Sequence, residues 1–263
     1  MKKYLEKIFN IFIMVVVICG IGLVFLAIPA SEISSLEKQT NNIRLEALEM
    51  LTNRKPVTIS KKIEPNFKQI RLSIVEISVG RAGGAGVIIK QDKKYLYVLT
   101  AKHVLTCKGR IVVQVTAVDG TKRKVIGIDR KNTYESEVID LGLIKVPRPK
   151  GIYKILDIAK TTPEVGKEIY TIGHPHNIHY AVNRGNVVGY AKRRMKKQCG
   201  FANYLVINAP AHTGNSGGPA INKYGQIIGI VVGRDYINKI PYPCIVFVTG
   251  LEYIENFLEE LKL

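Results

Sequence analysis

The stretch Gly214-Asn215-Ser216-Gly217-Gly218-Pro219 decides how the rest of this 263-residue sequence is interpreted. A serine between glycines suits a nucleophile, because glycine lets the backbone turn sharply and brings N–H groups close to a reacting carbonyl. If Ser216 is the nucleophile, the N–H groups of Gly214 and Ser216 can stabilise the oxyanion of acyl transfer. Alone, the stretch also fits a glycine-rich turn between two strands, so residues upstream must decide.

Two upstream segments supply the partners that a serine nucleophile needs. Histidine is the usual base that takes the hydroxyl proton, and His103 follows the apolar run Tyr95–Thr100, where a strand end can present an imidazole. Asp140 lies in the apolar segment Val138–Ile144. A buried carboxylate requires a strong partner, and the N–H of a histidine supplies one. The order His103, Asp140, Ser216 therefore predicts a catalytic triad.

The blocks "LTAKHV" (99–104), "DLGLIKV" (140–146) and "GNSGGPA" (214–220) resemble those of trypsin-like serine peptidases, which have the chymotrypsin fold. Other segments are similar to the bacterial HtrA/Deg branch: "GGAGVIIK" (83–90), "IGHP" (172–175), "NRGNVVGYAKR" (183–193) and "VFVTGLEYIENFL" (246–258). The resemblance covers about Ser73 to the C-terminus. It implies a serine endopeptidase with a His-Asp-Ser triad and an oxyanion hole of two backbone N–H groups, and we expect no cofactor and no metal ion.

The sequence also departs from digestive trypsins. Asn215 stands where those enzymes have an aspartate that pairs with an N-terminus released by cleavage, and no cleavable activation sequence precedes the domain. We therefore expect control through the ordering of neighbouring loops. Because the sequence reaches only to the terminal helix, we expect no PDZ-like domain after the protease domain. Cys107 follows His103 at a different spacing from the family's common disulfide, so that bond is not assumed, and any pairing among Cys107, Cys199 and Cys244 stays open.

Short β-rich runs separated by turn residues predict an all-β fold from residue 67 onward. The expected strands are Ser73–Val79, Gly86–Lys90, Tyr95–Thr100, Arg110–Ala117, Thr121–Asp129, Leu141–Val146, Glu168–Gly173, Tyr180–Tyr190, Tyr204–Asn208, Gln226–Val232 and Cys244–Val248. We expect a protease domain at 67–263 with two antiparallel six-stranded β-barrels, at about 67–147 and 152–248. A C-terminal helix at 250–262 is expected to follow, capped by Thr249.

The N-terminal region predicts a membrane anchor. Lysines at 2, 3 and 7 precede an uncharged apolar run at 8–29, long enough as a helix to cross a bilayer. The positive-inside rule places residues 1–7 in the cytoplasm and the protease domain outside the cell membrane. The rival interpretation is a signal peptide cleaved after Ala30 and a secreted protein; we favour an uncleaved single-pass anchor. Residues 30–66 read as a stalk and linker, with a weakly amphipathic helix over Ser31–Lys55.

Three residues near the nucleophile are candidates for the primary specificity pocket. Val231 and Val232 predict a wall that favours a small or medium apolar residue at the cleavage site. His212 could favour an acidic residue there, although a packing role is the simpler interpretation. His174, His176 and His179 also cluster in the sequence. Metal binding would need further ligands, and "GHP" is more simply a turn.

The formal net charge of +18 permits attraction to nucleic acid or anionic lipid. No nucleic-acid-reading motif accompanies the charge, so we expect no nucleic-acid partner. The basic segment Lys192–Lys197 reads first as a solvated loop, and alternatively as a contact for anionic lipid headgroups or a regulatory loop. Protein or peptide substrates in envelope quality control or processing are expected, and a homo-oligomer stays open. The rival functional class is a catalytically silent binding module at the membrane.

Overall fold

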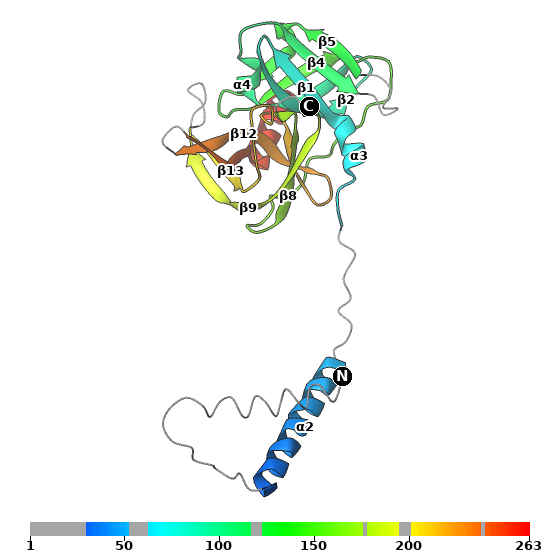
Figure 1. The fold of residues 1–263 in the computed structure, drawn as a ribbon. Coiled ribbons are helices and arrows are strands. Elements are labelled where there is room, and N and C mark those ends of the chain that lie inside the picture. The colour runs from blue at the N-terminus through cyan, green and yellow to red at the C-terminus, as the bar shows by residue number, and fades with distance from the viewer. Residues whose placement is uncertain (1–29, 53–62, 117–122, 176–177, 195–200, 238–239) are drawn as a thin grey trace. The chain divides into compact units, whose positions relative to one another are not determined.

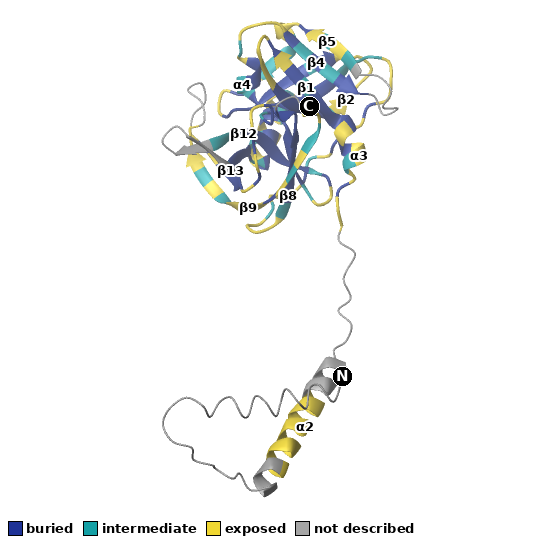
Figure 2. Cartoon of the chain, in the orientation of Figure 1, coloured by how far each residue is buried: buried dark blue, intermediate teal, exposed yellow. Residues whose placement is uncertain are grey.

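The protein is described by a computed structural model over residues 30–52, 63–116, 123–175, 178–194, 201–237 and 240–263 (Figure 1). It divides into two units, Met1–Lys61 and Lys62–Leu263. In the first unit, helix α2 (Ala30–Thr52) occupies the segment expected to be helical, and all of its described side chains are exposed (Figure 2). The expected tail at 1–7 and anchor at 8–29 lie outside the described residues. None of the described helices combines the length and the apolar character that a membrane span needs.

The first half of the second unit is an antiparallel seven-stranded sheet in the order β5-β4-β1-β2-β3-β7-β6. A short helix, α3 (Phe67–Ile70), and a 3-10 turn, η1 (Arg71–Ser73), lead into it. Its strands are β1 (Ile74–Val79), β2 (Ala82–Gln91), β3 (Tyr95–Thr100), β4 (Ile111–Thr116), β5 (Arg123–Ile128), β6 (Thr133–Glu135) and β7 (Gly142–Pro147). Of the seven strands of this sheet, only the three-residue β6 was not predicted from the sequence.

This sheet does not close, so the expectation of a six-stranded first barrel was wrong. After β5 the chain enters a 3-10 turn, η2 (Arg130–Asn132), which begins where Asp129 accepts the N–H of Lys131. The guanidinium of Arg130 donates to the carbonyls of Leu105, Cys107 and Gly109 and so ties the turn to the segment after β3. The short β6 then pairs with β7 alone, and no ladder among the described strands joins it to β5. The result is an open half-barrel.

The second half is a closed six-stranded barrel in the order β10-β13-β12-β11-β8-β9, as expected. Its strands are β8 (Glu168–Gly173), β9 (Ala181–Arg193), β10 (Ala202–Ile207), β11 (Pro219–Asn222), β12 (Ile227–Ile237) and β13 (Ile240–Thr249). The four-residue β11 was not predicted, because its residues directly follow the glycine-rich stretch and read as a continuation of it. Helix α5 (Leu251–Glu260) ends the fold. Its N-cap is Gly250 rather than Thr249, whose buried hydroxyl makes no hydrogen bond in the described part of the chain.

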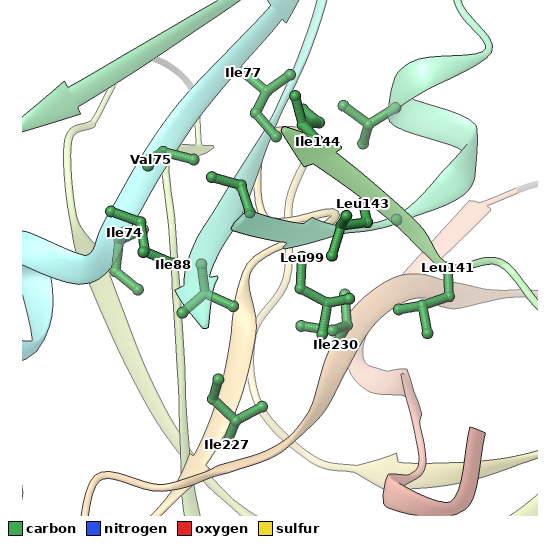
Figure 3. Packing of buried hydrophobic residues seen from close by; sticks show 14 of the residues in the cluster. Ile74, Val75, Ile77, Ile88, Leu99, Leu141, Leu143, Ile144, Ile227 and Ile230 are labelled. Atoms are coloured by element: carbon green, nitrogen blue, oxygen red, sulfur yellow. The ribbon is translucent and has the colours of Figure 1, made fainter. Parts of the chain in front are cut away.

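The core runs continuously from the half-barrel onto the barrel. Buried apolar side chains of β1, β3 and β7 form the core of the half-barrel, and the same buried cluster includes Ile227 and Ile230 of β12 (Figure 3). A second buried cluster, which includes Val231 and Leu205, fills the interior of the closed barrel. The nucleophile stretch and the histidine segment are therefore carried by two bodies that share one core.

The strand that leads to His103 is fixed at its start by Asp92. The carboxylate of Asp92 accepts the backbone N–H groups of Lys94 and Tyr95 at 2.6 and 2.7 Å and the hydroxyl of Tyr97 at 2.6 Å. The hydrogen bond from Tyr97 is the main reason why the pKa of Asp92 is lowered, and the same bond raises the pKa of Tyr97 to about 12. The β2–β3 turn therefore holds β3 in register where the chain approaches the site.

Candidate active site

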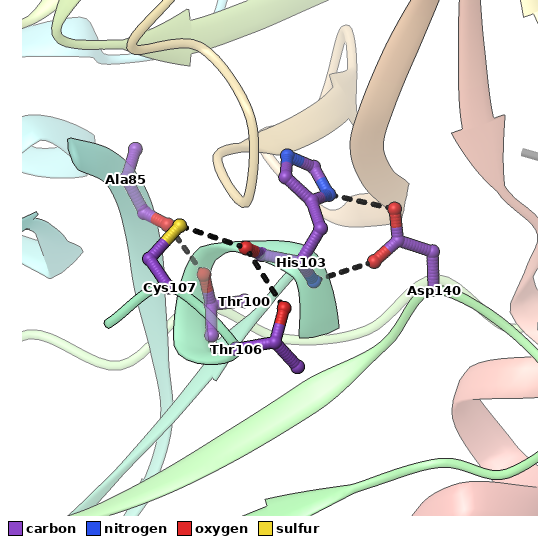
Figure 4. Close-up of polar contacts among 6 residues, drawn as sticks. All are labelled: Ala85, Thr100, His103, Thr106, Cys107 and Asp140. Atoms are coloured by element: carbon purple, nitrogen blue, oxygen red, sulfur yellow. Dashed lines mark hydrogen bonds and ion pairs between the residues drawn. The ribbon is translucent and has the colours of Figure 1, made fainter. Parts of the chain in front are cut away.

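His103 lies on the one-turn helix α4 (Lys102–Leu105), directly after β3. Its backbone N–H donates to Oδ1 of Asp140 at 2.8 Å, and its ring Nδ1 lies 2.6 Å from Oδ2 of the same carboxylate. The side chain of His103 is 22% exposed, whereas that of Asp140 is fully buried. Figure 4 shows the imidazole with Nδ1 turned toward Asp140 and the other ring nitrogen turned away. A carboxylate that accepts the Nδ1 proton leaves Nε2 as the free base of the ring.

The loop that carries Asp140 is held by its own polar groups. The hydroxyl of Ser136 accepts the N–H groups of Val138 and Ile139, and the N–H of Ser136 donates to the carbonyl of Leu141. The ammonium of Lys102, the neighbour of His103, donates to the carbonyl of Ser136 at 2.7 Å. These bonds fix the buried carboxylate relative to α4, so the pair His103–Asp140 is built before any substrate arrives.

Ser216 stands between two tight turns. In the first turn the N–H of Asn215 donates to the carbonyl of His212 at 3.0 Å, and Gly214 has φ +105°. In the second, the N–H of Gly218 donates to the carbonyl of Asn215, and Gly217 has φ +84°. A positive φ at the third residue is typical of a type II turn and favours glycine there. The two glycines therefore set the position of the serine at the cleft.

The N–H groups of Gly214 and Ser216 donate no hydrogen bond within the described part of the chain. Other backbone groups of the same stretch are bonded: the carbonyl of Ser216 accepts the N–H of Ala85 at 2.8 Å, and the N–H of Gly217 donates to Val231. Two unpaired donors beside a partly buried serine that lines a cleft are what an oxyanion hole requires. The bond from Ala85, on β2, ties the serine to the half-barrel that carries His103.

His103 and Ser216 line the same cleft, which has a volume of about 610 Å³. No hydrogen bond joins their side chains in the described structure; such bonds in unliganded enzymes are often long and tighten when substrate binds. Gly214 and the three expected pocket residues, His212, Val231 and Val232, also line this cleft, and Asp140 lies behind His103 as its buried partner.

The cleft has further residues that sequence reasoning missed. Phe247 of β13 lines it, with the guanidinium of Arg193 4.9 Å from the centre of its ring. Arg81, Arg194 and Arg234 also line the cleft, and no acidic residue does so among the described positions. The sequence did not indicate that these arginines lie near Ser216, because at least one strand separates each of them from it along the chain. Two residues of the basic segment Lys192–Lys197 thus face the cleft, while 195–197 lie outside the described residues.

The structure describes Asn215 and Cys107, two residues at which the sequence differs from digestive trypsins. Asn215 is 2% exposed, and its side-chain amide has no hydrogen-bond partner within the described residues. The thiol of Cys107 is free and contacts the carbonyl of His103 at 3.4 Å. The region around Cys199 and the side chain of Cys244 are not described, so the pairing question stays open for those two.

The family model described as a trypsin-like peptidase domain matches residues 84–230, more than half of the chain. The chain belongs to the trypsin-like peptidase family. That match confirms the resemblance inferred from the three sequence blocks.

Curated relatives of this trypsin-like peptidase include named bacterial endoproteases. It is 28% identical to the serine endoprotease DegS of Haemophilus influenzae, over 56% of this chain and 40% of that protein. It is 31% identical to the periplasmic serine endoprotease DegP of Escherichia coli, over 56% of this chain and 29% of that protein. The matches confirm the expected likeness to the HtrA/Deg branch. The chain spans less than half the length of these relatives.

Solved structures support the same fold. An inactive form of Rv3671c from Mycobacterium tuberculosis has a TM-score of 0.60 at 20% identity, covering 79% of this chain and 94% of that one. The HtrA-type protease AlgW with a tripeptide has a TM-score of 0.59 at 16% identity, covering 74% and 63%. A serine endoprotease from Yersinia pestis has a TM-score of 0.56 at 25% identity, covering 74% and 66%.

Proposed function

We propose that this trypsin-like peptidase is an active serine endopeptidase that uses His103, Asp140 and Ser216. The observation that carries the proposal is the fully buried carboxylate of Asp140, which binds both the backbone N–H and Nδ1 of His103. Burying a carboxylate costs free energy, and a binding module would gain nothing from it. A serine peptidase gains an oriented imidazole whose second nitrogen faces the cleft that Ser216 lines. The two unpaired N–H groups at that serine point to the same function.

In the mechanism that we propose, Nε2 of His103 takes the hydroxyl proton of Ser216 as its oxygen attacks the scissile carbonyl. The developing oxyanion is bound by the N–H groups of Gly214 and Ser216. Asp140 holds the ring in the tautomer that leaves Nε2 free and stabilises the imidazolium. The imidazolium then protonates the leaving amine, and water hydrolyses the acyl-enzyme with His103 again as base. None of these steps uses a group other than the chain's own residues.

Covalent labelling separates this proposal from the binding module. A fluorophosphonate probe phosphonylates a serine only when a base activates its oxygen, so we expect the intact protein to be labelled at Ser216. Mass spectrometry of the digested adduct locates the label, and the S216A variant is the control for labelling elsewhere. A folded wild-type protein that binds peptides yet stays unlabelled would establish the binding module instead.

The cellular setting of the proposed enzyme follows from the apolar run at 8–29, which we propose as a single-pass anchor that keeps the protease domain outside the cell membrane. A curated relative from Haemophilus influenzae is named a periplasmic serine protease, which agrees with that side of the membrane. Substrates would then be exported proteins, in quality control or in processing. N-terminal sequencing of the mature protein decides between the anchor and a cleaved signal peptide.

We further propose that the cleft selects peptides with an apolar residue at the scissile bond and acidic residues beside it. Val231 and Phe247 supply apolar walls, and the charged groups that line the described cleft are all basic. Attraction between exposed guanidinium groups and substrate carboxylates is worth up to roughly 1 kcal/mol per pair and weakens with salt. The acidic preference proposed here rests on the arginines of the cleft and not on His212, which the sequence analysis considered for it.

The R81Q variant tests the acidic preference. We expect its selectivity for acidic over neutral peptides, measured as a ratio of kcat/KM values, to fall by about fivefold relative to wild type at low salt. The K223Q variant removes an exposed charge that does not line the cleft and should keep the wild-type ratio. Equal ratios in R81Q and wild type, with activity retained, would show that Arg81 does not select substrates.

A further inference from the structure

A second cavity, of about 300 Å³, lies behind the turn that carries Ser216. It is lined by Glu76 of β1, by His174 immediately after β8, and by Thr213 and Gly214 of the nucleophile turn. His174 is 7% exposed, and its ring Nε2 is buried. The cavity thus places a carboxylate from the half-barrel opposite an imidazole from the closed barrel.

A third donor joins this pair from the segment that precedes β9. His179 Nδ1 lies 3.3 Å from a carboxylate oxygen of Glu76, and the rings of His174 and His179 meet edge to face at 5.8 Å between centres. Each of Glu76, His174 and His179 offers one ligand atom, and these three atoms lie within 4.8 Å of one another. In a tetrahedral zinc site with bonds of about 2.0–2.1 Å, neighbouring donors are about 3.4 Å apart. The Glu76–His179 pair is therefore at ligand spacing, and binding an ion would draw the His174 donor closer to it.

The backbone holds His179 against His174. Tyr180 adopts φ +58°, which is rare outside glycine and reverses the chain immediately after His179. The hydroxyl of Tyr180 is 3.0 Å from the hydroxyl of Thr116 on β4, and its ring packs edge to face on that of His174. This bend is fixed by the fold rather than by the Glu76–His179 pair alone, so the three donors are preorganised.

We propose that Glu76, His174 and His179 bind one divalent transition-metal ion, with Zn²⁺ the favoured ion and solvent completing the coordination. Two imidazoles and one carboxylate are a known zinc ligand set, and imidazole nitrogen selects Zn²⁺ over Mg²⁺ and Ca²⁺, which take oxygen ligands. The ion links Glu76 on β1 of the half-barrel to His174 and His179, which lie between β8 and β9 of the closed barrel in the sequence. The metal site does not depend on the chain's being a peptidase.

The ion would act on the nucleophile turn through the backbone of His174. The N–H of His174 donates to the carbonyl of Gly214 at 3.2 Å. A Cβ placed on Gly214 would meet the carbonyl oxygen of His174 at 2.2 Å, so the two backbones are in direct contact. Fixing His174 by a metal bond therefore fixes one of the two groups proposed to bind the oxyanion.

The experiment uses the full chain carrying S216A, so that neither self-cleavage nor activity enters the readout. Addition of Co²⁺ should give visible d–d absorption of a four-coordinate ion, and Zn²⁺ should displace it at one ion per chain. Zn²⁺ should also raise the Tm, because an ion that binds only the folded state stabilises it. The E76Q and H179N variants should each weaken Zn²⁺ affinity by more than about 10-fold while keeping the wild-type circular dichroism spectrum.

Matched variants of the same chemistry locate the ion. E255Q removes an exposed carboxylate on α5, and H212N removes the imidazole in the catalytic cleft, so both should keep full affinity. Loss of binding in H212N with retention in E76Q and H179N would place the ion in the cleft and overturn the proposal. A folded chain that binds no Co²⁺ or Zn²⁺ stoichiometrically would overturn it as well.

Discussion

The D140N variant is expected to lower kcat by about 10⁴-fold, with a much smaller change in KM. Asp140 now accepts two hydrogen bonds from His103, one from the backbone N–H at 2.8 Å and one from Nδ1 at 2.6 Å. An asparagine amide can accept only through its oxygen, so its NH₂ group must face one of these donors. If it faces the ring, the imidazole changes tautomer and presents a protonated Nε2, which cannot take the serine proton.

Steady-state kinetics on a peptide substrate across pH, together with the Tm of the variant, measure this effect. The D129N variant is the matched control, because Asp129 is an exposed carboxylate that caps η2 away from the cleft. A D140N enzyme with kcat within about tenfold of wild type would contradict the assigned role of Asp140. A large fall in Tm would show that the buried carboxylate also stabilises the loop at 136–141.

The G214A variant is expected to lower kcat by about 10²- to 10³-fold, the usual effect of losing one oxyanion donor. A methyl group at residue 214 would lie 2.2 Å from the carbonyl oxygen of His174, and φ +105° is unfavourable for any residue with a Cβ. The turn must therefore rearrange, and the N–H of residue 214 moves away from the cleft. Strain at such a position costs about 1–3 kcal/mol, which the Tm would report.

The control for this change is G189A in β9, where an added methyl group meets no heavy atom within 4 Å and φ is not positive. Its kcat should equal that of wild type. Because the oxyanion forms only during the reaction, G214A should change kcat far more than KM. Retention of most of the wild-type kcat by a folded G214A enzyme would show that the Gly214 N–H does not bind the oxyanion.

Strand positions could be predicted because short runs rich in β-branched, aromatic and other apolar residues, bounded by turn residues, are typical of strands. β3 and β8 occupy the predicted residues, β1 begins one residue later than predicted, and β4 is one residue shorter at each end. β6 and β11 were missed because three or four residues carry too little periodicity to be distinguished from a turn. β12 and β13 extend further than predicted, since beyond Val231 they pair with each other through register shifts that no apolar pattern marks.

Closure of the first sheet could not be predicted for a different reason. Two edge strands form a ladder only if the intervening chain can carry one to the other. Here the guanidinium of Arg130 donates to three carbonyls of the segment after β3. The residues of the turn do not indicate which distant carbonyls the arginine will bind. Most strands of this sheet could therefore be predicted. That the sheet stays open could not.

The sequence by itself determined the β class, the family and the three residues proposed for catalysis, because each lies in a short block whose local pattern is diagnostic. Only the tertiary structure decided which distant residues meet: the arginines line one cleft with Ser216, and Glu76 lies beside His174 and His179. Local patterns record burial and turns, whereas strand order fixes which side chains meet. No ligand beyond the histidine cluster was identified from the sequence. Glu76 reaches the histidines because β1, which carries it, lies in the sheet beside the closed barrel.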